Sequence, residues 1–346
     1  MNRLKEIIKQ LYIYKVYLEW KIWQSEKVRF INELNDYKDI SADDRKRYIS
    51  SLKYYRISPS EYFRQYKFDK LSKSERTEYI TRSEMQKVYR KLVKPEIRKS
   101  FYNKVLFLNT FASVIKRRWI LADCSANKDA LVELLTSVDT IVKPIEGSLG
   151  NGIYKINRNS IVEPRSLADK LMRDGVLVEE CVCATDEIQS YHPNSLNTIR
   201  VVTFSNSLKS EVIGAFIRFG CHGSVVDNAH AGGVFATIDV KTGEVISNGL
   251  DTDGKEYVNH PDTNKPIKGF IIPNWELVVN TCLRATKIVP GLKFAGWDCV
   301  VLPHGGGIDI IEGNHGPDVD VMQSPLRKGI RTLISSKLKE YFDYKL

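Results

Sequence analysis

Two apolar runs near the C-terminus carry acids where buried strands are expected to carry none. Residues 294–302 are apolar apart from Asp298, and residues 308–314 contain Glu312 near their end. The segment between them, 303–307, is Pro-His-Gly-Gly-Gly and has the composition of a turn. The pattern therefore predicts a β-hairpin with charged groups on a face that should be buried.

The register of this hairpin predicts a metal site. Pairing Leu302 with Ile308 places Asp298 directly opposite Glu312, and Asn314 two residues further on shares their face. Two opposed carboxylates repel each other and lose solvation, so they persist when a hard cation lies between them. Oxygen ligands of this kind suit Mg²⁺ carried in with a nucleotide phosphate.

One further acid in the second run, Asp309, does not share this face in a regular strand. It lies an odd number of residues from Glu312, so alternation turns it to the other side. We expect Asp309 at the surface or behind the metal ligands.

Positive charge is concentrated in the first third of the chain. The formal net charge is +10, and residues 1–104 hold 26 Lys and Arg against 14 Asp and Glu. Such a segment suits an anionic partner, whether a lipid surface, a pyrophosphate-linked precursor or nucleic acid, and equally suits a solvated helical surface. Residues 1–35 have apolar residues at helical spacing with lysines and aromatics between them, which predicts a helix that packs on the body or lies on an anionic membrane.

The remaining composition favours a reduced, cytoplasmic protein. The six cysteines are scattered and form no CxxC pair, which argues for free thiols. No apolar stretch is long enough for a transmembrane helix, and the N-terminus has charges throughout rather than a signal-peptide core.

The pattern of expected secondary structure changes near residue 100. Capped short helices are expected over 41–100, whereas helices and hairpin-forming strands mix afterwards, which predicts an α+β fold. The expected helices are 101–116, 128–136, 165–173 and 274–288. The expected strands are 140–143, 152–156, 176–179, 198–204, 212–218 and 234–240.

A second motif has the composition of a phosphate-binding loop. A strand ends at Lys143-Pro, and the loop that follows contains Gly147, Ser148, Gly150 and Gly152. Glycines let backbone N–H groups approach phosphate oxygens. The loop is neither a Walker A loop nor a GxGxxG fingerprint, and an ordinary hairpin turn explains it as well.

Next, the apolar run 176–178 meets Glu179, Glu180, Cys181 and Val182. Such a strand end suits an adenine pocket, in which backbone groups and a carboxylate read the base.

In order along the chain, these pieces resemble the ATP-grasp superfamily, and more closely its sugar-transfer-associated family. The shared segments are Asn103-Lys104, the Lys143-Pro loop, Leu-Val-Glu-Glu at 177–180, Ser-Leu-Asn-Thr-Ile-Arg at 195–200, Ala-Gly-Gly-Val at 231–234, His-Pro-Asp-Thr at 260–263, Ile-Pro-Asn-Trp at 272–275 and Gly-Trp-Asp at 296–298. The resemblance covers the chain from about residue 55 to the C-terminus.

The resemblance implies a role for each matching residue. Residues that would bind ATP are Lys104, Lys143, Gly147, Ser148, Gly150, Gly152, Glu179, Glu180, Cys181, Val182 and Glu187. Arg200 and Arg218 would neutralise the phosphoryl group in transfer, and Asp298, Glu312 and Asn314 would bind Mg²⁺. The chain departs from the family pattern at 183–187, which weakens the ribose role of Glu187. The α/β domain that often precedes this fold is also replaced by helices.

The resemblance further implies an organisation and an activity. We expect a basic helical region at 1–100, an N-terminal ATP-grasp subdomain at 101–180 and a C-terminal subdomain at 181–346, with ATP clamped between the subdomains. The expected activity is an ATP- and Mg²⁺-dependent carboxylate–amine ligase that acts on a uronic-acid sugar or precursor in polysaccharide biosynthesis, with no nucleic-acid partner. The alternatives are a kinase on the same fold and a non-catalytic nucleotide-binding scaffold.

Overall fold

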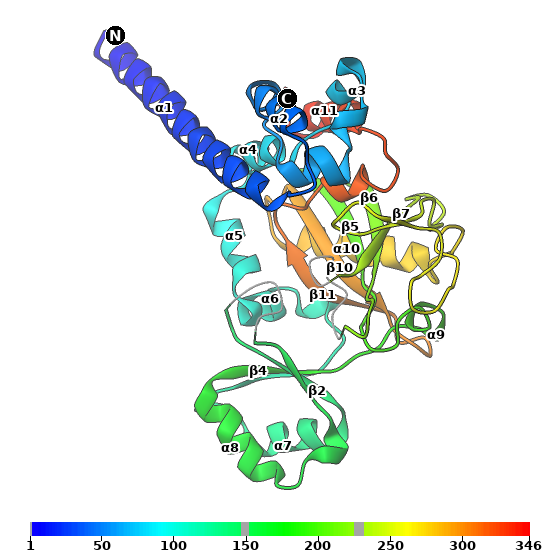
Figure 1. The fold of residues 1–346 in the computed structure, drawn as a ribbon. Coiled ribbons are helices and arrows are strands. Elements are labelled where there is room, and N and C mark those ends of the chain that lie inside the picture. Colours follow the sequence, from blue (N-terminus) through cyan, green and yellow to red (C-terminus); the bar gives the residue numbers. More distant parts are fainter. Residues whose placement is uncertain (1, 147–151, 225–231) are drawn as a thin grey trace.

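The computed structural model describes residues 2–146, 152–224 and 232–346. It has three parts: a small sheet with two helices, a larger sheet, and a helical region at the N-terminus from which one long helix projects (Figure 1). The helices are α1 (Asn2–Glu33), α2 (Ala42–Tyr55), α3 (Lys73–Thr77), α4 (Arg82–Leu92), α5 (Pro95–Tyr102), α6 (Lys104–Thr110), α7 (Lys128–Ser137), α8 (Pro164–Asp174), α9 (Asp186–Gln189), α10 (Trp275–Ile288) and α11 (Arg331–Phe342).

All strands pair antiparallel and form two separate sheets. The four-stranded sheet has the order β1-β4-β2-β3, and the seven-stranded sheet has the order β11-β10-β5-β6-β7-β8-β9. The strands are β1 (Trp119–Ala122), β2 (Thr140–Lys143), β3 (Tyr154–Ile156), β4 (Val176–Glu180), β5 (Ile199–Ser205), β6 (Ser210–Phe219), β7 (Val234–Ile238), β8 (Gly249–Leu250), β9 (Glu256–Tyr257), β10 (Phe294–Val301) and β11 (Ile308–Asn314).

The small sheet is stabilised by α7 and α8, which cover one of its faces (Figure 1). Leu131 and Leu135 of α7 and Leu171 of α8 are fully buried against Val142 and Val178 of the strands. Full burial of one such side chain contributes roughly 1.5–3 kcal/mol. This small core fixes the position of β2 and β4, whose ends form one side of the site.

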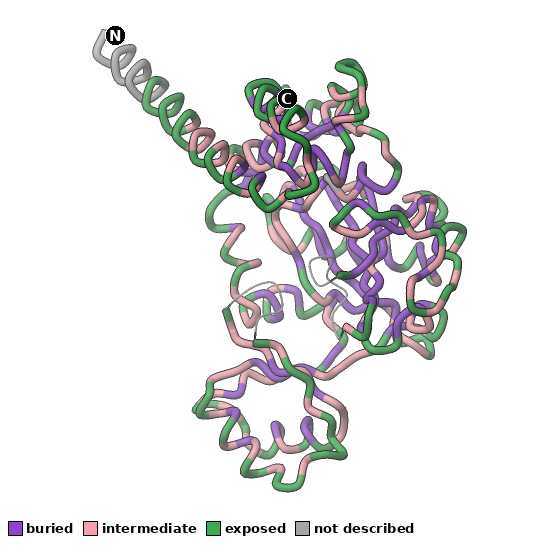
Figure 2. The backbone as a smooth tube through the Cα atoms, viewed as in Figure 1, coloured by how far each residue is buried: buried purple, intermediate pink, exposed green. Residues whose placement is uncertain are grey.

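The larger sheet forms the main core together with α10. Figure 2 shows its strands as largely buried. Trp297 of β10 is fully buried, and its indole N–H donates to Thr286 of α10 at 2.9 Å and to Thr203 of β5 at 3.2 Å. A buried Trp needs such partners for its N–H group, so this face of β10 is fixed and the opposite face is left for the site.

The N-terminal helices have a core of their own. Phe30 at the end of α1 packs with Tyr48, Leu52, Tyr62 and further aromatics, all of them buried. The preceding part of α1 projects beyond this core, and Tyr14, Tyr17 and Trp20 are exposed on it (Figures 1 and 2). In the part of the chain that the structure describes, no helix is both long and apolar enough to span a bilayer.

The predicted α+β class is confirmed, with local differences. The helix expected over 101–116 is broken at Asn103, which caps α6 by accepting from the backbone N–H of Leu106. An Asn at an N-cap favours a new helix start over continuation. The strands β8 and β9 were not expected, because they are only two residues long and leave little periodicity to detect. The four-residue strand β1 was not expected either.

Candidate active site

The hairpin places the two predicted acids opposite each other. Asp298 of β10 pairs with Glu312 of β11, so this part of the sequence prediction is confirmed. The register near the turn differs from the expectation, because Val301 rather than Leu302 pairs with Ile308. Asn314 follows on the same strand, and its amide lies 3.3 Å from Glu312 Oε1.

A β-bulge between the turn and the acids restores their pairing. The register shifts beside Asp298, which leaves Ile311 as the extra residue on β11. The shift also brings Asp309 opposite Val300, and therefore onto the face of Asp298. The prediction that Asp309 lies on the other face was wrong, because the bulge interrupts the alternation; nor is it at the surface, since Asp309 is fully buried.

Asp298 is held by two arginines from neighbouring strands. Arg200 lies opposite it on β5 and makes a bidentate contact, with Nη2 at 2.7 Å from Oδ2. Arg218 of β6 lies at 2.8 Å from the same oxygen. Burial raises the pKa of Asp298, but both guanidinium groups lower it, and the net pKa is below the ordinary value. Asp298 is therefore an anion at neutral pH.

Thr198 positions Arg218. The side chain of Arg218 donates to Thr198 Oγ1 from Nε at 3.0 Å and from Nη2 at 2.6 Å, and its backbone N–H donates to the Thr198 carbonyl at 2.9 Å. Just before it, Asn197 has a left-handed backbone (φ 54°) and is fully buried, and its Oδ1 accepts from the Gly220 N–H. The Ser-Leu-Asn-Thr-Ile-Arg segment thus orients both arginines.

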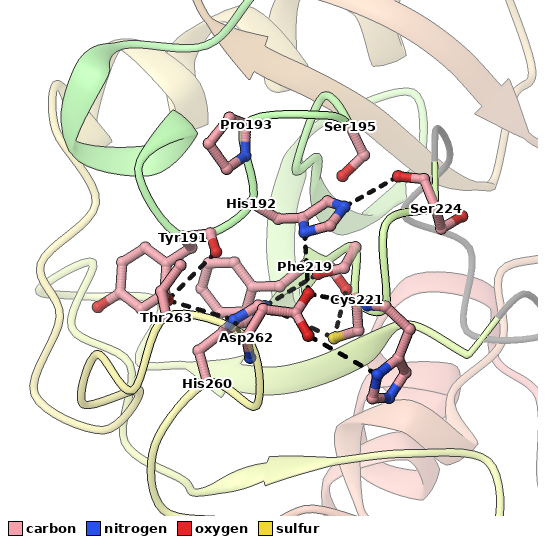
Figure 3. Close-up of polar contacts among 12 residues, drawn as sticks. Tyr191, His192, Pro193, Ser195, Phe219, Cys221, Ser224, His260, Asp262 and Thr263 are labelled. Carbon is pink, nitrogen blue, oxygen red and sulfur yellow. Dashed lines mark hydrogen bonds and ion pairs between the residues drawn. The ribbon is translucent and has the colours of Figure 1, made fainter.

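A buried polar network supports this segment from behind (Figure 3). His192 Nδ1 lies 3.1 Å from Asp262, and His260 Nε2 lies 2.9 Å from the carbonyl of Gly220. Burial raises the pKa of the neighbouring Cys221 thiol to about 12, so this cysteine stays protonated and is no nucleophile. The network therefore has a structural role and holds the loop that carries His260 and Asp262 against the end of β6.

The small sheet contributes a second group of charges. Lys143 at the end of β2 lies 3.0 Å from the carboxylate of Glu179 on β4, and Arg117 also pairs with Glu179. Burial raises the pKa of Glu179, but Lys143 and Arg117 outweigh it and bring the pKa to about 2. The contact of Glu179 with adenine remains a prediction. In this structure its carboxylate pairs with the side chains of Lys143 and Arg117.

Lys104 connects the two groups of charges. It begins α6, and burial together with Lys143 lowers its pKa, while Glu312 and Glu179 oppose this shift. Lys104 is thus within electrostatic range of residues of both sheets, although it is not among the residues that line the cavity. A lysine in this position suits a phosphate bound across the cleft.

The strand end after Glu179 lies at the cleft, as expected for an adenine site. Glu180, Cys181 and Val182 line the cavity, although the Cys181 N–H already donates to the Asp139 carbonyl at 2.8 Å. Glu187 is exposed on α9 and is not among the residues that line the cavity. The structure therefore gives no support to its predicted ribose role.

The predicted phosphate loop is only partly described. Gly147, Ser148 and Gly150 lie outside the described residues. Gly152 has φ 74°, and a Cβ there would lie 2.9 Å from Pro144 Cγ, so only glycine fits beside the Lys-Pro junction.

One open cavity of about 1430 Å³ lies between the sheets and joins most of these groups. The predicted residues that line it are Lys143, Glu179, Glu180, Cys181, Val182, Arg200, Arg218, Asp298, Glu312 and Asn314. Cations and oxygen ligands thus face one another across a cleft between two antiparallel sheets. The family described as sugar-transfer associated ATP-grasp matches residues 74–337, well over half of the chain.

This chain belongs to the sugar-transfer associated ATP-grasp family.

Solved structures are similar to this chain at low identity. The ATP-grasp ligase PsnB, complexed with minimal precursor, Mg and ADP, is 15% identical with a TM-score of 0.44, and the match covers 73% of this chain and 62% of that ligase. D-alanyl-alanine synthetase A from Vibrio cholerae is 11% identical with a TM-score of 0.41, covering 71% of this chain and 66% of that enzyme. A search of curated proteins found no match to this chain.

The oxygen donors of this ATP-grasp hairpin fit a hard cation. Glu312 is exposed to the cleft, Asn314 lies beside it, and Asp298 faces both from β10. Among residues 2–146, 152–224 and 232–346, no three acidic, His or Cys side chains gather closely enough to hold a metal alone. Mg²⁺ usually takes only one or two carboxylates and completes its shell with phosphate oxygens and water, so this set suits Mg²⁺ delivered with ATP.

Sequence reasoning missed Arg117. Its side chain is buried, pairs with Glu179 of the small sheet, and lies 3.1 Å from Asp309 of the large sheet. It also donates to the carbonyls of Ile310 and Ile311 at 2.8 and 3.0 Å. The only signal was the run Lys-Arg-Arg at 116–118, which does not reveal which cation is buried.

Proposed function

We propose that this protein is an ATP- and Mg²⁺-dependent carboxylate–amine ligase that amidates a uronic-acid sugar or its precursor during polysaccharide biosynthesis. The observation that carries the proposal is the cross-strand pair Asp298–Glu312 beside Arg200 and Arg218, across the cleft from Lys143. Family membership supports the sugar context, and ATP-grasp ligases as a class join a carboxylate to an amine.

The residues of the cleft suit transfer of a phosphoryl group. Lys104 and Lys143 would hold the ATP phosphates from the small-sheet side, and Arg200 and Arg218 would neutralise the γ-phosphoryl group as it moves. Mg²⁺, held by Glu312, Asn314 and Asp298, would supply charge neutralisation at the phosphate oxygens. Charge neutralisation and alignment are what such a transfer requires of the protein.

The proposed reaction has two steps. An oxygen of the acceptor carboxylate attacks the γ-phosphorus, the bond to the β-phosphate oxygen breaks, and ADP leaves an acylphosphate behind. The amine then attacks the acyl carbon, the C–O bond to phosphate breaks, and an amide, inorganic phosphate and a proton result.

The test combines three product measurements. The protein is incubated with ATP, Mg²⁺, uronates such as D-glucuronate, and amino acids, and ADP, free phosphate and amide are followed. A ligase gives all three in equal amounts. ADP with a stable phosphorylated acceptor and no free phosphate would instead show a kinase.

The metal assignment has its own control. Glu312→Gln removes one carboxylate charge from an exposed position, so we expect an unchanged melting temperature and turnover lowered by about 100-fold or more. Glu276→Gln, an exposed change in the first turn of α10, should leave turnover unchanged. Retained activity in Glu312→Gln would refute the metal role.

We also propose that the protein is cytoplasmic and that α1 contacts an anionic membrane, which would keep it close to membrane-linked sugar precursors. Tyr17 and Trp20 are stacked and exposed, and Lys21 lies over the Tyr17 ring. Exposed aromatics beside lysines suit the lipid interface. Replacing Tyr17 and Trp20 with Gln should reduce flotation with anionic liposomes, whereas Tyr54→Gln, an exposed tyrosine of α2, should not. Equal flotation of both variants would reject the contact.

A further inference from the structure

The cavity extends well beyond the nucleotide-binding residues. Its walls include Phe30 at the end of α1, Ser60, and Gln86 of α4 from the N-terminal helical region. Its volume of about 1430 Å³ exceeds the roughly 300–1,000 Å³ typical of a site for one small molecule. The cleft therefore has room for a second substrate between the nucleotide and these helices.

A row of alternating charges leads from these helices to the proposed reaction centre. Glu33 of α1 interacts electrostatically with Arg82 of α4. Arg82 Nε lies 3.5 Å from Asp318 Oδ1, and Asp318 in turn acts on Arg200. Arg82, Asp318 and Arg200 all line the cavity, so Arg82 is a cation of the helical region that shares the cleft with the groups expected to hold the γ-phosphoryl group.

The backbone of Arg82 is fixed while its side chain reaches the cavity. Thr81 and Glu84 form a capping box around the start of α4, and the Arg82 N–H donates to the buried carboxylate of Glu61 at 2.7 Å. Glu84 is anchored in turn by Arg331 of α11 at 2.6 Å. The Arg82 side chain is nevertheless 48% exposed, so a rigid element presents a solvated guanidinium group to the cleft.

We propose that Arg82 binds the carboxylate of the acceptor substrate, in a subsite that the N-terminal helices form beside the phosphoryl-transfer centre. The inference rests on the proposed ligase function and names the residue that selects its acceptor class. A guanidinium group matches the planar carboxylate with two parallel hydrogen bonds. Because Arg82 and Arg200 line the same cavity, a carboxylate held by Arg82 lies in the same cleft as the γ-phosphoryl group.

The subsite also explains how helices can take the place of a preceding α/β domain. The cavity wall that Glu33, Ser60 and Arg82 form comes from three separate segments of the helical region. Phe30 and Tyr62 pack the first two segments into one core, and the backbone N–H of Arg82 donates to Glu61 of the second segment, so the polar groups keep a fixed spacing. The helical region is thereby a wall of the active site rather than an appendage.

The test measures binding of a carboxylate probe separately from binding of nucleotide. D-Glucuronate is titrated by calorimetry into protein saturated with Mg²⁺ and a non-hydrolysable ATP analogue, and neutral D-glucose serves as the probe that lacks the carboxylate. In Arg82→Gln we expect D-glucuronate to bind at least about tenfold more weakly, the scale of a charged hydrogen bond. Affinity for the ATP analogue should stay within about twofold of the unaltered protein. Arg82→Lys should recover part of the loss, because lysine keeps the charge without the planar geometry.

A matched control and the contrary outcomes are available. Arg47 of α2 also pairs with an aspartate, Asp44, but lies outside the cavity, so Arg47→Gln should bind both ligands normally. Equal D-glucuronate affinity in Arg82→Gln, an equal loss in Arg47→Gln, or no D-glucuronate binding by the unaltered protein would each overturn the proposal. Failure of the ligase function is distinguishable: D-glucuronate would bind through Arg82, yet no amide would form. Conversely, normal amide formation by Arg82→Gln would leave the ligase standing and reject the subsite.

Discussion

The two sheets each present one buried carboxylate held by two cations, yet the two arrangements differ in accessibility. In the large sheet, Asp298 pairs with Arg200 and Arg218, whose side chains are 9% and 17% exposed at the edge of the cavity. In the small sheet, Glu179 pairs with Lys143 and with Arg117, and the Arg117 side chain is only 2% exposed. The cations of the large sheet keep more exposed surface for a ligand, whereas Arg117 borders the same cavity but is almost wholly buried.

This difference separates residues expected to act in catalysis from residues expected to stabilise the fold, within one cleft. Removing one partner of a buried ion pair is costly because the other charge stays buried without compensation. Groups at the cavity edge keep some water and some room for a ligand, so their loss should act mainly on turnover. The following changes test that division.

The largest effect is expected for Arg117→Met. This change leaves Glu179 and Asp309 buried without their shared cation, so the free energy of unfolding should fall by about 3–5 kcal/mol. Urea unfolding followed by circular dichroism measures it. A loss below about 1 kcal/mol would show that Arg117, which links the two sheets, does not stabilise the fold.

Asp298→Asn should act chiefly on catalysis. It removes the anion that holds Arg200 and Arg218 in place, so turnover of ATP should fall by about 100-fold or more. Its effect on the free energy of unfolding should be smaller than that of Arg117→Met, because both arginines lie at the cavity. Steady-state ADP release and urea unfolding are the two measurements, and the reverse ranking in stability would contradict the comparison.

Glu179 should contribute a pH-dependent part of the stability. Its pKa in the folded protein is about 2 against an ordinary 4.5, so its contribution is fully present above about pH 4.5 and is lost as the pH falls toward 2. In Glu179→Gln, the free energy of unfolding should therefore fall less steeply over this window. Glu180→Gln, at the neighbouring half-exposed position, is the control, and parallel slopes in the unaltered protein and Glu179→Gln would contradict the assignment.

The smallest effect is expected for Arg118→Met, the neighbour of Arg117. Arg118 pairs with Glu180 at 3.4 Å, but its side chain is 47% exposed. Exposed pairs contribute roughly 0–1 kcal/mol. Arg117 and Arg118 are adjacent and pair with adjacent glutamates, so the two variants differ mainly in how deeply the ion pair is buried. Similar losses of unfolding free energy in Arg117→Met and Arg118→Met would contradict the comparison.

Much of the fold could be predicted because its signals are local. The strands at 140–143 and 176–180 are apolar runs with clear ends. The hairpin composition puts Asp298 and Glu312 on neighbouring strands, although their direct pairing also depends on a bulge. The bulge at Ile311 could not be predicted, because no residue there departs from an ordinary strand pattern. It was therefore the face on which Asp309 lies that the sequence prediction missed.

The part of the site that depends on tertiary contacts could not be predicted from the sequence, for a different reason. Arg82 and Arg117 are two of many cations in a basic segment, and nothing in the sequence distinguishes the one that reaches the cleft from the one that is buried. Their roles depend on contacts with Asp318 and Asp309, which lie about 200 residues away or more along the chain. Only the packing of the two sheets and the helical region brings these pairs together.

The joint at Arg117 has a consequence for motion. This side chain links β4 of the small sheet to the carbonyls of Ile310 and Ile311 on β11, next to the proposed metal ligand Glu312. If the small sheet rotates to admit a nucleotide, the rotation axis should lie near Arg117 and the displacement should be largest at α7 and α8. The cleft could then open and close around ATP while the spacing between Glu179 and the hairpin acids hardly changes.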